Sequence, residues 1–139
     1  MPVYLKKLVS VIFVLFLALR AFAPIYNSLV IVTNPADEPF KRLVHAIGMV
    51  ETKSDTLMYN PVEEAAGYFQ IRPIRLLDYN NRTGSKYTMF DLFRYDISEK
   101  IFLYYASEIG PYNFERIAKN WNGKGKETIF YWNQVKKYL

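Results

Sequence analysis

The sequence predicts a mainly helical domain of the α+β class, with about five helices and one small irregular or β-like lobe. From residue 34 onward, most segments carry apolar residues at the three- and four-residue spacing of amphipathic helices. One stretch, residues 53–72, lacks that spacing and is rich in turn formers. The chain has 139 residues, of which 51% are hydrophobic, and this suffices for one compact core. We expect the irregular stretch to form one wall of a cleft.

Residues 1–23 have the layout of a secretory signal peptide. Lysines at positions 6–7 precede an apolar run over residues 8–19, and a small-x-small tripeptide closes the segment. The run is shorter than the roughly 20 residues of a membrane span. Pro24 fits a processing protease poorly at the expected cleavage site, so an uncleaved N-terminal membrane anchor is the alternative, and a buried helix of a cytosolic protein is another. We predict export to the periplasm, cell envelope or exterior, with residues 24–139 as the folded domain.

Charge and composition exclude several classes of function. The formal net charge is +5, but without the three basic residues of the N-terminal segment 15 basic residues face 13 acidic ones. These charges are mixed along the chain, so no nucleic-acid partner is expected. The absence of cysteine excludes disulfides and thiolate metal sites, and the single histidine, His45, falls on the polar side of its helix. We expect no metal or cofactor, which leaves carboxylates as the candidates for proton transfer.

The first helix is predicted from the segment 34–37, with proline at its first helical position, to about Thr52. Glu51 falls on the last turn beside the apolar stripe. Its carboxyl group is therefore expected at the edge of the core. The stripe consists of Phe40, Leu43, Val44, Ile47 and Val50.

The irregular stretch has turn signals at Asn60-Pro61 and Gly67 around a short apolar run, residues 68–71. Pro73 can open a second helix, and the polar cluster at residues 80–84 closes it. The apolar positions of this helix are Leu76, Leu77 and Tyr79.

Three further helices complete the predicted domain. Residues 96–99 resemble a capping box with Asp96 in the cap position, and Gly110-Pro111 ends the helix that they open. Asn113 can cap a fourth helix over residues 114–120. A fifth runs from about Glu127 to the end, with its buried side formed by Ile129, Trp132 and Val135.

Three local features point to sugar binding. They are a carboxylate at a helix end, a Gly-aromatic-aromatic-Gln turn and a Trp-Asn-Gly turn. The chain also has twelve tyrosines and two tryptophans, whose flat apolar faces and polar tips suit stacking on pyranose rings.

Four blocks in order carry a resemblance to a known family. They are Glu51–Lys53, then Ala66–Ile71 followed by Pro73, then Ile117–Gly123, and then Glu127–Tyr131. The order resembles the soluble lytic transglycosylase branch of the lysozyme-like superfamily. In that family the blocks read roughly Glu-Ser, Gly-Leu-Met-Gln-Ile-x-Pro, Ala-x-Tyr-Asn-x-Gly and Glu-Thr-x-x-Tyr. The resemblance covers about residues 40 to 139 and implies a lysozyme-like fold.

The resemblance also implies roles for individual residues. Glu51 would be the general acid that protonates the glycosidic oxygen and then the base of the second step. Gln70 would shape the cleft floor, and Asn122 would hold a sugar or its N-acetyl group. Tyr131 would line the cleft near the catalytic carboxyl group, and Glu127 of the same block is included among the substrate-binding candidates.

The chain departs from the family pattern at several positions. Thr52 replaces the usual serine, Tyr68-Phe69 replaces Leu-Met, and Trp121 replaces the usual tyrosine. A hydroxyl group is thereby missing near the reaction centre, and Tyr104 or Tyr105 is the candidate to supply it. Trp121 is a candidate sugar platform, with a core anchor as its alternative role.

The chemistry of Glu51 also has its own physical argument. A glutamic acid with a pKa of about 4.3 is ionised at neutral pH, whereas an apolar wall can raise the pKa to about 6. The expected wall consists of Ile47, Val50 and Phe69. A classical glycosidase needs a second carboxylate. Four other carboxylates are available, but none of them lies in a sequence block that requires a second carboxylate. They are Asp55, Glu63, Glu64 and Asp78.

We therefore predict a monomeric peptidoglycan lytic transglycosylase that cleaves the β-1,4 bond between N-acetylmuramic acid and N-acetylglucosamine. Its partner would be the glycan strand. The alternatives are a catalytically weak or inactive wall-binding or scaffolding domain and a true muramidase hydrolase on the same fold. In the plainest alternative for Glu51, its carboxylate only pairs with Lys53 or Arg72.

Overall fold

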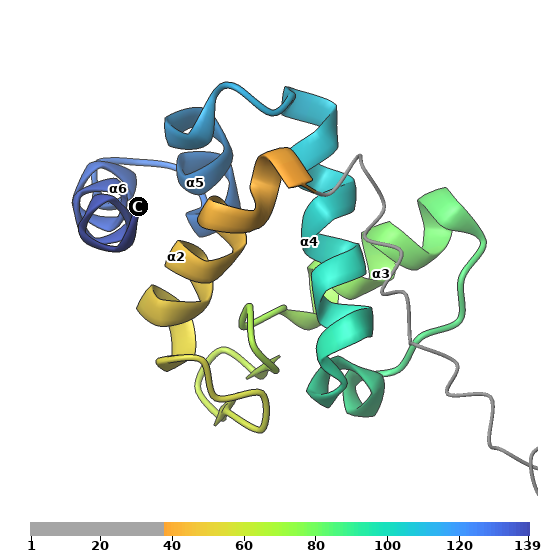
Figure 1. Cartoon of the computed structure of the whole chain (residues 1–139). Helices are drawn as coiled ribbons and strands as arrows, with labels where there is room; N and C mark the ends of the chain where they lie inside the picture. The colour runs from red at the N-terminus through yellow and green to blue at the C-terminus, as the bar shows by residue number, and fades with distance from the viewer. Residues whose placement is uncertain (1–37) are drawn as a thin grey trace, which may run out of the picture. The chain divides into compact units, whose positions relative to one another are not determined.

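The computed structural model describes residues 38–139, so the predicted signal segment and the helix start at residues 34–37 lie outside the described residues. This part of the chain contains five α-helices and a two-stranded antiparallel sheet, which confirms the predicted mainly helical class (Figure 1). None of these helices combines the length and the apolarity needed to cross a membrane. The elements are η1 (Glu38–Phe40), α2 (Lys41–Thr52), β1 (Tyr59–Asn60), β2 (Ala65–Ala66), α3 (Pro73–Thr83), η2 (Met89–Phe93), α4 (Tyr95–Ile109), α5 (Phe114–Asn122), α6 (Glu127–Val135) and η3 (Lys136–Tyr138).

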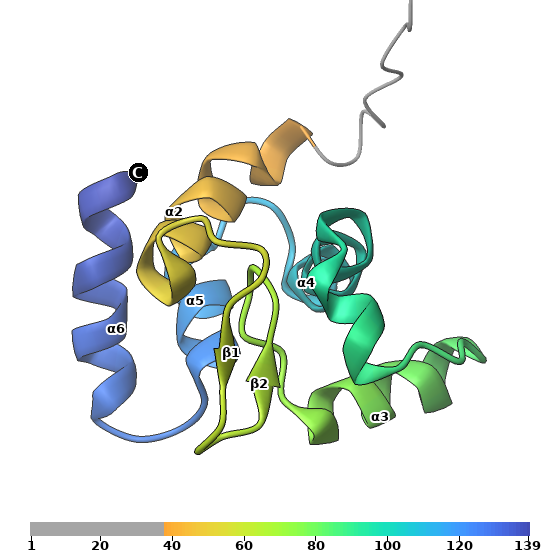
Figure 2. The same cartoon turned by 90° about the horizontal axis from the view of Figure 1, so that it is seen from below.

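Helix α2 lies between α6 on one side and α3 with α4 on the other (Figures 1 and 2). Its predicted apolar stripe is buried from Phe40 to Ile47, while Val50 is only partly buried. The helix ends because Lys53 and Ser54 adopt left-handed backbone angles, with φ of 57° and 69°. Glu51 therefore lies on the final turn of α2, as predicted.

Gly48 lets the lobe pack closely against α2. A Cβ atom at this position would lie 1.9 Å from the ring of Tyr68. The tyrosine ring therefore rests directly on the helix backbone, and its hydroxyl group lies 3.3 Å from the Ser54 hydroxyl. This contact brings the turn that follows the sheet against the C-terminal end of α2.

The predicted irregular lobe contains a short hairpin, which lies at the C-terminal end of α2 between α6 and α3 (Figure 2). Strand β1 pairs with β2 in the register Tyr59 to Ala66, and Ala66 also bridges to Ile71. Arg72 donates two hydrogen bonds to Glu63, at 2.7 and 3.1 Å, and so ties the hairpin tip to the start of α3. Both side chains are about half exposed, so this ion pair contributes little to stability.

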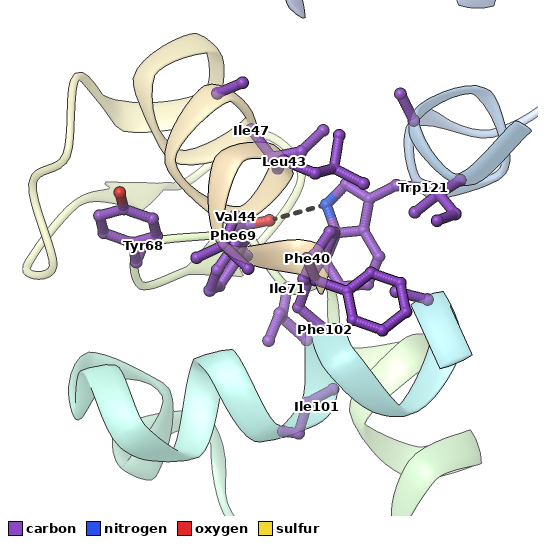
Figure 3. Packing of buried hydrophobic residues seen from close by; sticks show 14 of the residues in the cluster. Phe40, Leu43, Val44, Ile47, Tyr68, Phe69, Ile71, Ile101, Phe102 and Trp121 are labelled. Atoms are coloured by element: carbon purple, nitrogen blue, oxygen red, sulfur yellow. Dashed lines mark hydrogen bonds between the residues drawn. The ribbon is translucent and has the colours of Figure 1, made fainter. Parts of the chain in front are cut away.

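The centre of the core is an aromatic cluster (Figure 3). Phe69 and Phe102 stack with ring centroids 4.7 Å apart, and Trp121 packs edge-on against Phe102 at 5.0 Å. The indole nitrogen of Trp121 donates a hydrogen bond to the Phe69 carbonyl oxygen at 3.2 Å. This cluster joins the turn after β2 to α4 and α5.

Two predicted details of the helices are wrong. Asp96 does not cap α4, because the helix begins at Tyr95 and Asp96 lies inside its first turn. The Asp96 carboxylate instead pairs with Arg94 at 2.8 Å. The cap residue is Arg94, which makes no side-chain hydrogen bond to the helix backbone. Ile129 is 55% exposed, because the buried face of α6 is formed by Thr128, Tyr131 and Val135. The Asn113 cap of α5 is confirmed, since its side-chain oxygen accepts a hydrogen bond from the Arg116 backbone N–H at 3.0 Å.

Candidate active site

Glu51 and Tyr131 form the centre of the candidate site. The Tyr131 hydroxyl donates a hydrogen bond to Oε1 of Glu51 at 2.6 Å, which joins α6 to the last turn of α2. Tyr131 is 7% exposed, and Glu51 is partly buried. The carboxyl group thus lies at the edge of the core and is held by a short hydrogen bond from a buried phenol.

Burial raises the pKa of Glu51 to about 7, because water no longer solvates the charged form. The hydrogen bond from Tyr131 opposes this rise, as do the charges of Arg72 and Arg75, while the Glu63 carboxylate adds to it. At neutral pH a large share of Glu51 is therefore protonated. This is the state that a general acid requires.

The turn between β2 and α3 is held from two sides. The Thr52 hydroxyl lies 3.2 Å from the Tyr68 carbonyl oxygen on the α2 side. Trp121 donates to the next carbonyl, that of Phe69, from the α5 side. Thr52 is buried and the indole is 6% exposed, so both hydrogen bonds are shielded from water. The ends of α2 and α5 are consequently fixed relative to the same turn.

Gln70 closes this turn in a left-handed conformation, with φ of 48°. Its amide nitrogen donates to the carbonyl oxygens of Met58 and Gly67, at 3.2 and 3.1 Å. The amide group therefore stabilises the lobe. Its oxygen has no hydrogen-bond partner within residues 38–139, so only the oxygen remains available to bind another molecule.

The other predicted substrate residues are more dispersed. Trp121 lies in the core, which was its alternative role, and the Arg75 guanidinium lies 4.0 Å from its ring centroid. Asn122 is the last residue of α5 and is partly buried. Glu127 is exposed at the start of α6, four residues before Tyr131.

A cavity of about 330 Å³ opens between α3, α4 and α5. Tyr105, another predicted substrate residue, lines it and donates a hydrogen bond to Asp78 at 2.7 Å. Arg82 binds both Asp78 and Glu108, at 2.9 and 3.2 Å, and so connects α3 to α4. Apolar side chains complete the lining: Ile74, Ala106, Ile109, Ile117 and part of Trp121.

Arg75 was missed by the sequence reasoning. Its guanidinium donates to the carbonyl oxygens of Trp121 and Asn120 at the C-terminal end of α5, at 2.9 and 3.4 Å. It also lines the cavity, and its charge affects the pKa of both Glu51 and Tyr131. The available signal was helical spacing, since Arg75, Asp78 and Arg82 follow one another three and four residues apart.

The charged neighbours of Glu51 have other partners. Arg72 pairs with Glu63, and Lys53 Nζ lies 3.3 Å from the Tyr138 hydroxyl. No ion pair of Glu51 is present in residues 38–139. The simple ion-pair alternative for Glu51 is therefore wrong for this part of the chain.

Within the described residues, no three His, Asp or Glu side chains gather closely enough to hold a metal ion. Comparison of the chain with protein-family models, with curated proteins and with solved structures finds no match. The site is therefore interpreted from its own geometry.

If Glu51 acts as a general acid, replacing Tyr131 with Phe should move the alkaline limb of the pH–activity profile upward by about one pH unit. The hydroxyl favours the ionised form of Glu51, so its removal raises the Glu51 pKa further above 7. Steady-state rates from pH 5 to 10 measure the shift. Tyr105→Phe is the matched control, because its hydroxyl binds Asp78 instead. An unmoved limb in Tyr131→Phe would refute this coupling.

Proposed function

We propose that this chain is a peptidoglycan lytic transglycosylase with a lysozyme-like fold and that Glu51 is its catalytic acid and base. The observation that carries the proposal is the Glu51–Tyr131 pair, in which a partly buried carboxyl group with a pKa of about 7 ends a core helix. The four sequence blocks add support, because the pair joins the first block to the last.

In the proposed reaction, Glu51 donates its proton to the oxygen of the β-1,4 bond as the bond to the anomeric carbon breaks. The N-acetyl carbonyl oxygen of the muramic acid attacks that carbon and stabilises the developing positive charge. Glu51, now ionised, takes the proton of the 6-hydroxyl group as this oxygen displaces the N-acetyl oxygen. The product is a 1,6-anhydro sugar, and no water is consumed.

A mechanism with one carboxylate agrees with the partners of the other acidic residues. Asp55 accepts the Leu57 backbone N–H at 2.8 Å and so closes its own turn. Glu63 is bound by Arg72, and Asp78 by Tyr105 and Arg82. Within the described residues, none of them forms a hydrogen bond to Glu51. We therefore favour substrate-assisted cleavage over a two-carboxylate mechanism.

The cavity between α3, α4 and α5 is the region where we place part of the glycan strand. Its lining of both apolar and polar side chains suits a sugar, which presents both hydroxyl groups and C–H faces. Glu51 is not among the lining residues, but Arg75 is, and the charge of Arg75 is among those that lower the pKa of Glu51.

Mass spectrometry of the fragments released from purified sacculi tests the reaction type. We expect muropeptides that end in 1,6-anhydro-N-acetylmuramic acid, which are lighter by one water than hydrolysed products. Products with free reducing ends would instead assign a muramidase. Absence of any release would reject an enzyme of this class.

A non-catalytic wall-binding domain is the second candidate. The observation that favours it is the missing hydroxyl group: Trp121 presents an indole that is bonded to the core, and the Tyr105 hydroxyl is bound to Asp78 and to the Arg75 carbonyl. Co-sedimentation with sacculi in the absence of released muropeptides would support this function.

Export and a monomeric state belong to the same proposal. Residues 1–23 would direct the chain to the cell envelope and, if uncleaved, tether it to the membrane, so that the domain meets peptidoglycan. The molecular mass of the chain recovered from an expressing cell would show whether the segment is removed.

A further inference from the structure

We propose that Arg75 is a specificity-determining residue that binds a carboxylate carried by the glycan substrate. The inference rests on the proposed function, because it assigns the ligand of the cavity between α3, α4 and α5, where we place part of the glycan strand. Arg75 would distinguish acidic glycans that contain muramic acid from neutral N-acetylglucosamine polymers. Glu51 and Tyr131 do not make this distinction.

The hydrogen bonds of Arg75 leave part of its guanidinium unused. Two of its nitrogens donate to the carbonyl oxygens of Trp121 and Asn120. Nε has no partner among residues 38–139, yet every buried side-chain nitrogen in this part of the chain has one. The Nε–H is therefore not fully buried, and Arg75 lines the cavity.

The guanidinium of Arg75 also has no carboxylate bonded directly to it in this part of the chain. No ion pair of Arg75 is present in residues 38–139. The guanidinium is partly buried against Trp121, and burial lowers its pKa, which shows that its charge has lost solvation. An arginine remains protonated in a protein, so this position offers a desolvated cation with a free donor. A carboxylate is the group that best satisfies both properties.

The other charged side chains that line the cavity are bound to one another. Arg82 is shared by Asp78 and Glu108, so these three side chains carry a net charge of −1. Of the two arginines that line the cavity, only Arg75 has no ion pair within residues 38–139. The guanidinium is already held by two carbonyl groups and by the Trp121 ring, so little side-chain entropy is lost on binding.

An NMR titration of the full chain with monosaccharides, which contain no glycosidic bond to cleave, tests the proposal. The matched ligands are N-acetylmuramic acid and its methyl ester, which differ in one charge. We expect the acid to bind the wild type roughly 10-fold more tightly or better, as a charge-assisted hydrogen bond predicts. Arg75→Met should bind both ligands equally, near the affinity of the wild type for the ester. Arg75→Lys should keep part of the preference.

Equal binding of acid and ester by the wild type, for the monosaccharide and for N-acetylmuramoyl dipeptide alike, would overturn the proposal without any variant. A preference that persists in Arg75→Met would overturn it as well. N-acetylmuramoyl dipeptide identifies the source of the carboxylate, since its lactyl group is amidated and its charges lie on the peptide. An Arg75-dependent preference for the dipeptide over its methyl esters would assign the peptide as the source.

The experiment also separates this inference from the proposed function. Monosaccharides carry no bond to cleave, so their binding does not depend on Glu51. Release of anhydro products without a preference for the carboxylate would reject the role of Arg75 alone. A preference without any cleavage of sacculi would retain the role of Arg75 and reject the enzyme.

Discussion

Glu51→Gln is expected to lower the cleavage of sacculi by two to four orders of magnitude, the usual contribution of a general acid. The amide keeps the size of the side chain and an oxygen that accepts the Tyr131 hydrogen bond. It cannot donate a proton of comparable acidity to a glycosidic oxygen. Zymography and product quantification measure the loss. Undiminished clearing by the variant would show that another group is the acid.

The same substitution should make the domain more stable at alkaline pH. Burial raises the Glu51 pKa in the folded state, so its stabilising contribution is complete below the unfolded-state pKa and is lost as pH rises through about 7. At pH 8 the native protein holds a poorly solvated carboxylate, and Glu51→Gln removes that cost of up to about 3 kcal/mol. Urea unfolding at pH 5 and 8 checks this. The difference in the free energy of unfolding between the variant and the wild type should be small at pH 5. A variant that is less stable at pH 8 would contradict the burial of the acid.

Gly67→Ala is expected to lower the free energy of unfolding by about 3 kcal/mol or more. Gly67 has φ of +76°, which disfavours a side chain, and a Cβ atom there would lie 2.0 Å from the Leu92 carbonyl oxygen. That oxygen belongs to the backbone and accepts the Ser98 hydroxyl at 2.9 Å, so it cannot move freely. Denaturant unfolding measures the loss, and activity should fall with it because Gln70 bonds to Gly67.

Gly84→Ala is the matched control for Gly67→Ala. Its φ of +71° is nearly the same, but no atom lies within 4 Å of the added carbon. It should cost only the left-handed backbone strain, about 1 kcal/mol. Equal losses in the two variants would mean that backbone strain, and not the close approach of η2 to the turn, explains the glycine at position 67.

Much of the fold could be predicted because its signals are local. The apolar spacing of α2 located Glu51 on the last turn, and Asn113 and Gly84 marked helix ends through turn chemistry that acts within a few residues. The buried face of α6 could not be predicted from local pattern, because this helix is apolar almost all round. Packing against α2 decides that Tyr131 faces inward and Ile129 outward.

The candidate site was predicted in part for the same reason. Glu51 lies on a patterned helix, whereas the role of Arg75 depends on α5, whose carbonyl groups lie 45 and 46 residues further along the chain. Trp121 shows the opposite problem. A tryptophan beside an asparagine suits either a sugar platform or a core, and only the neighbouring Phe69, Phe102 and Arg75 decide between them.

The hydrogen bond between Tyr131 and Glu51 spans 80 positions of the chain and has a consequence during protein synthesis. Helix α6 leaves the ribosome after every other helix described here, so a nascent chain carries Glu51 long before it carries its phenol partner. Until α6 docks, the carboxyl group lacks the burial that α6 provides, so we expect its pKa to lie closer to the ordinary value. If Glu51 is the acid of the proposed reaction, its proton donation therefore requires that α6 has docked.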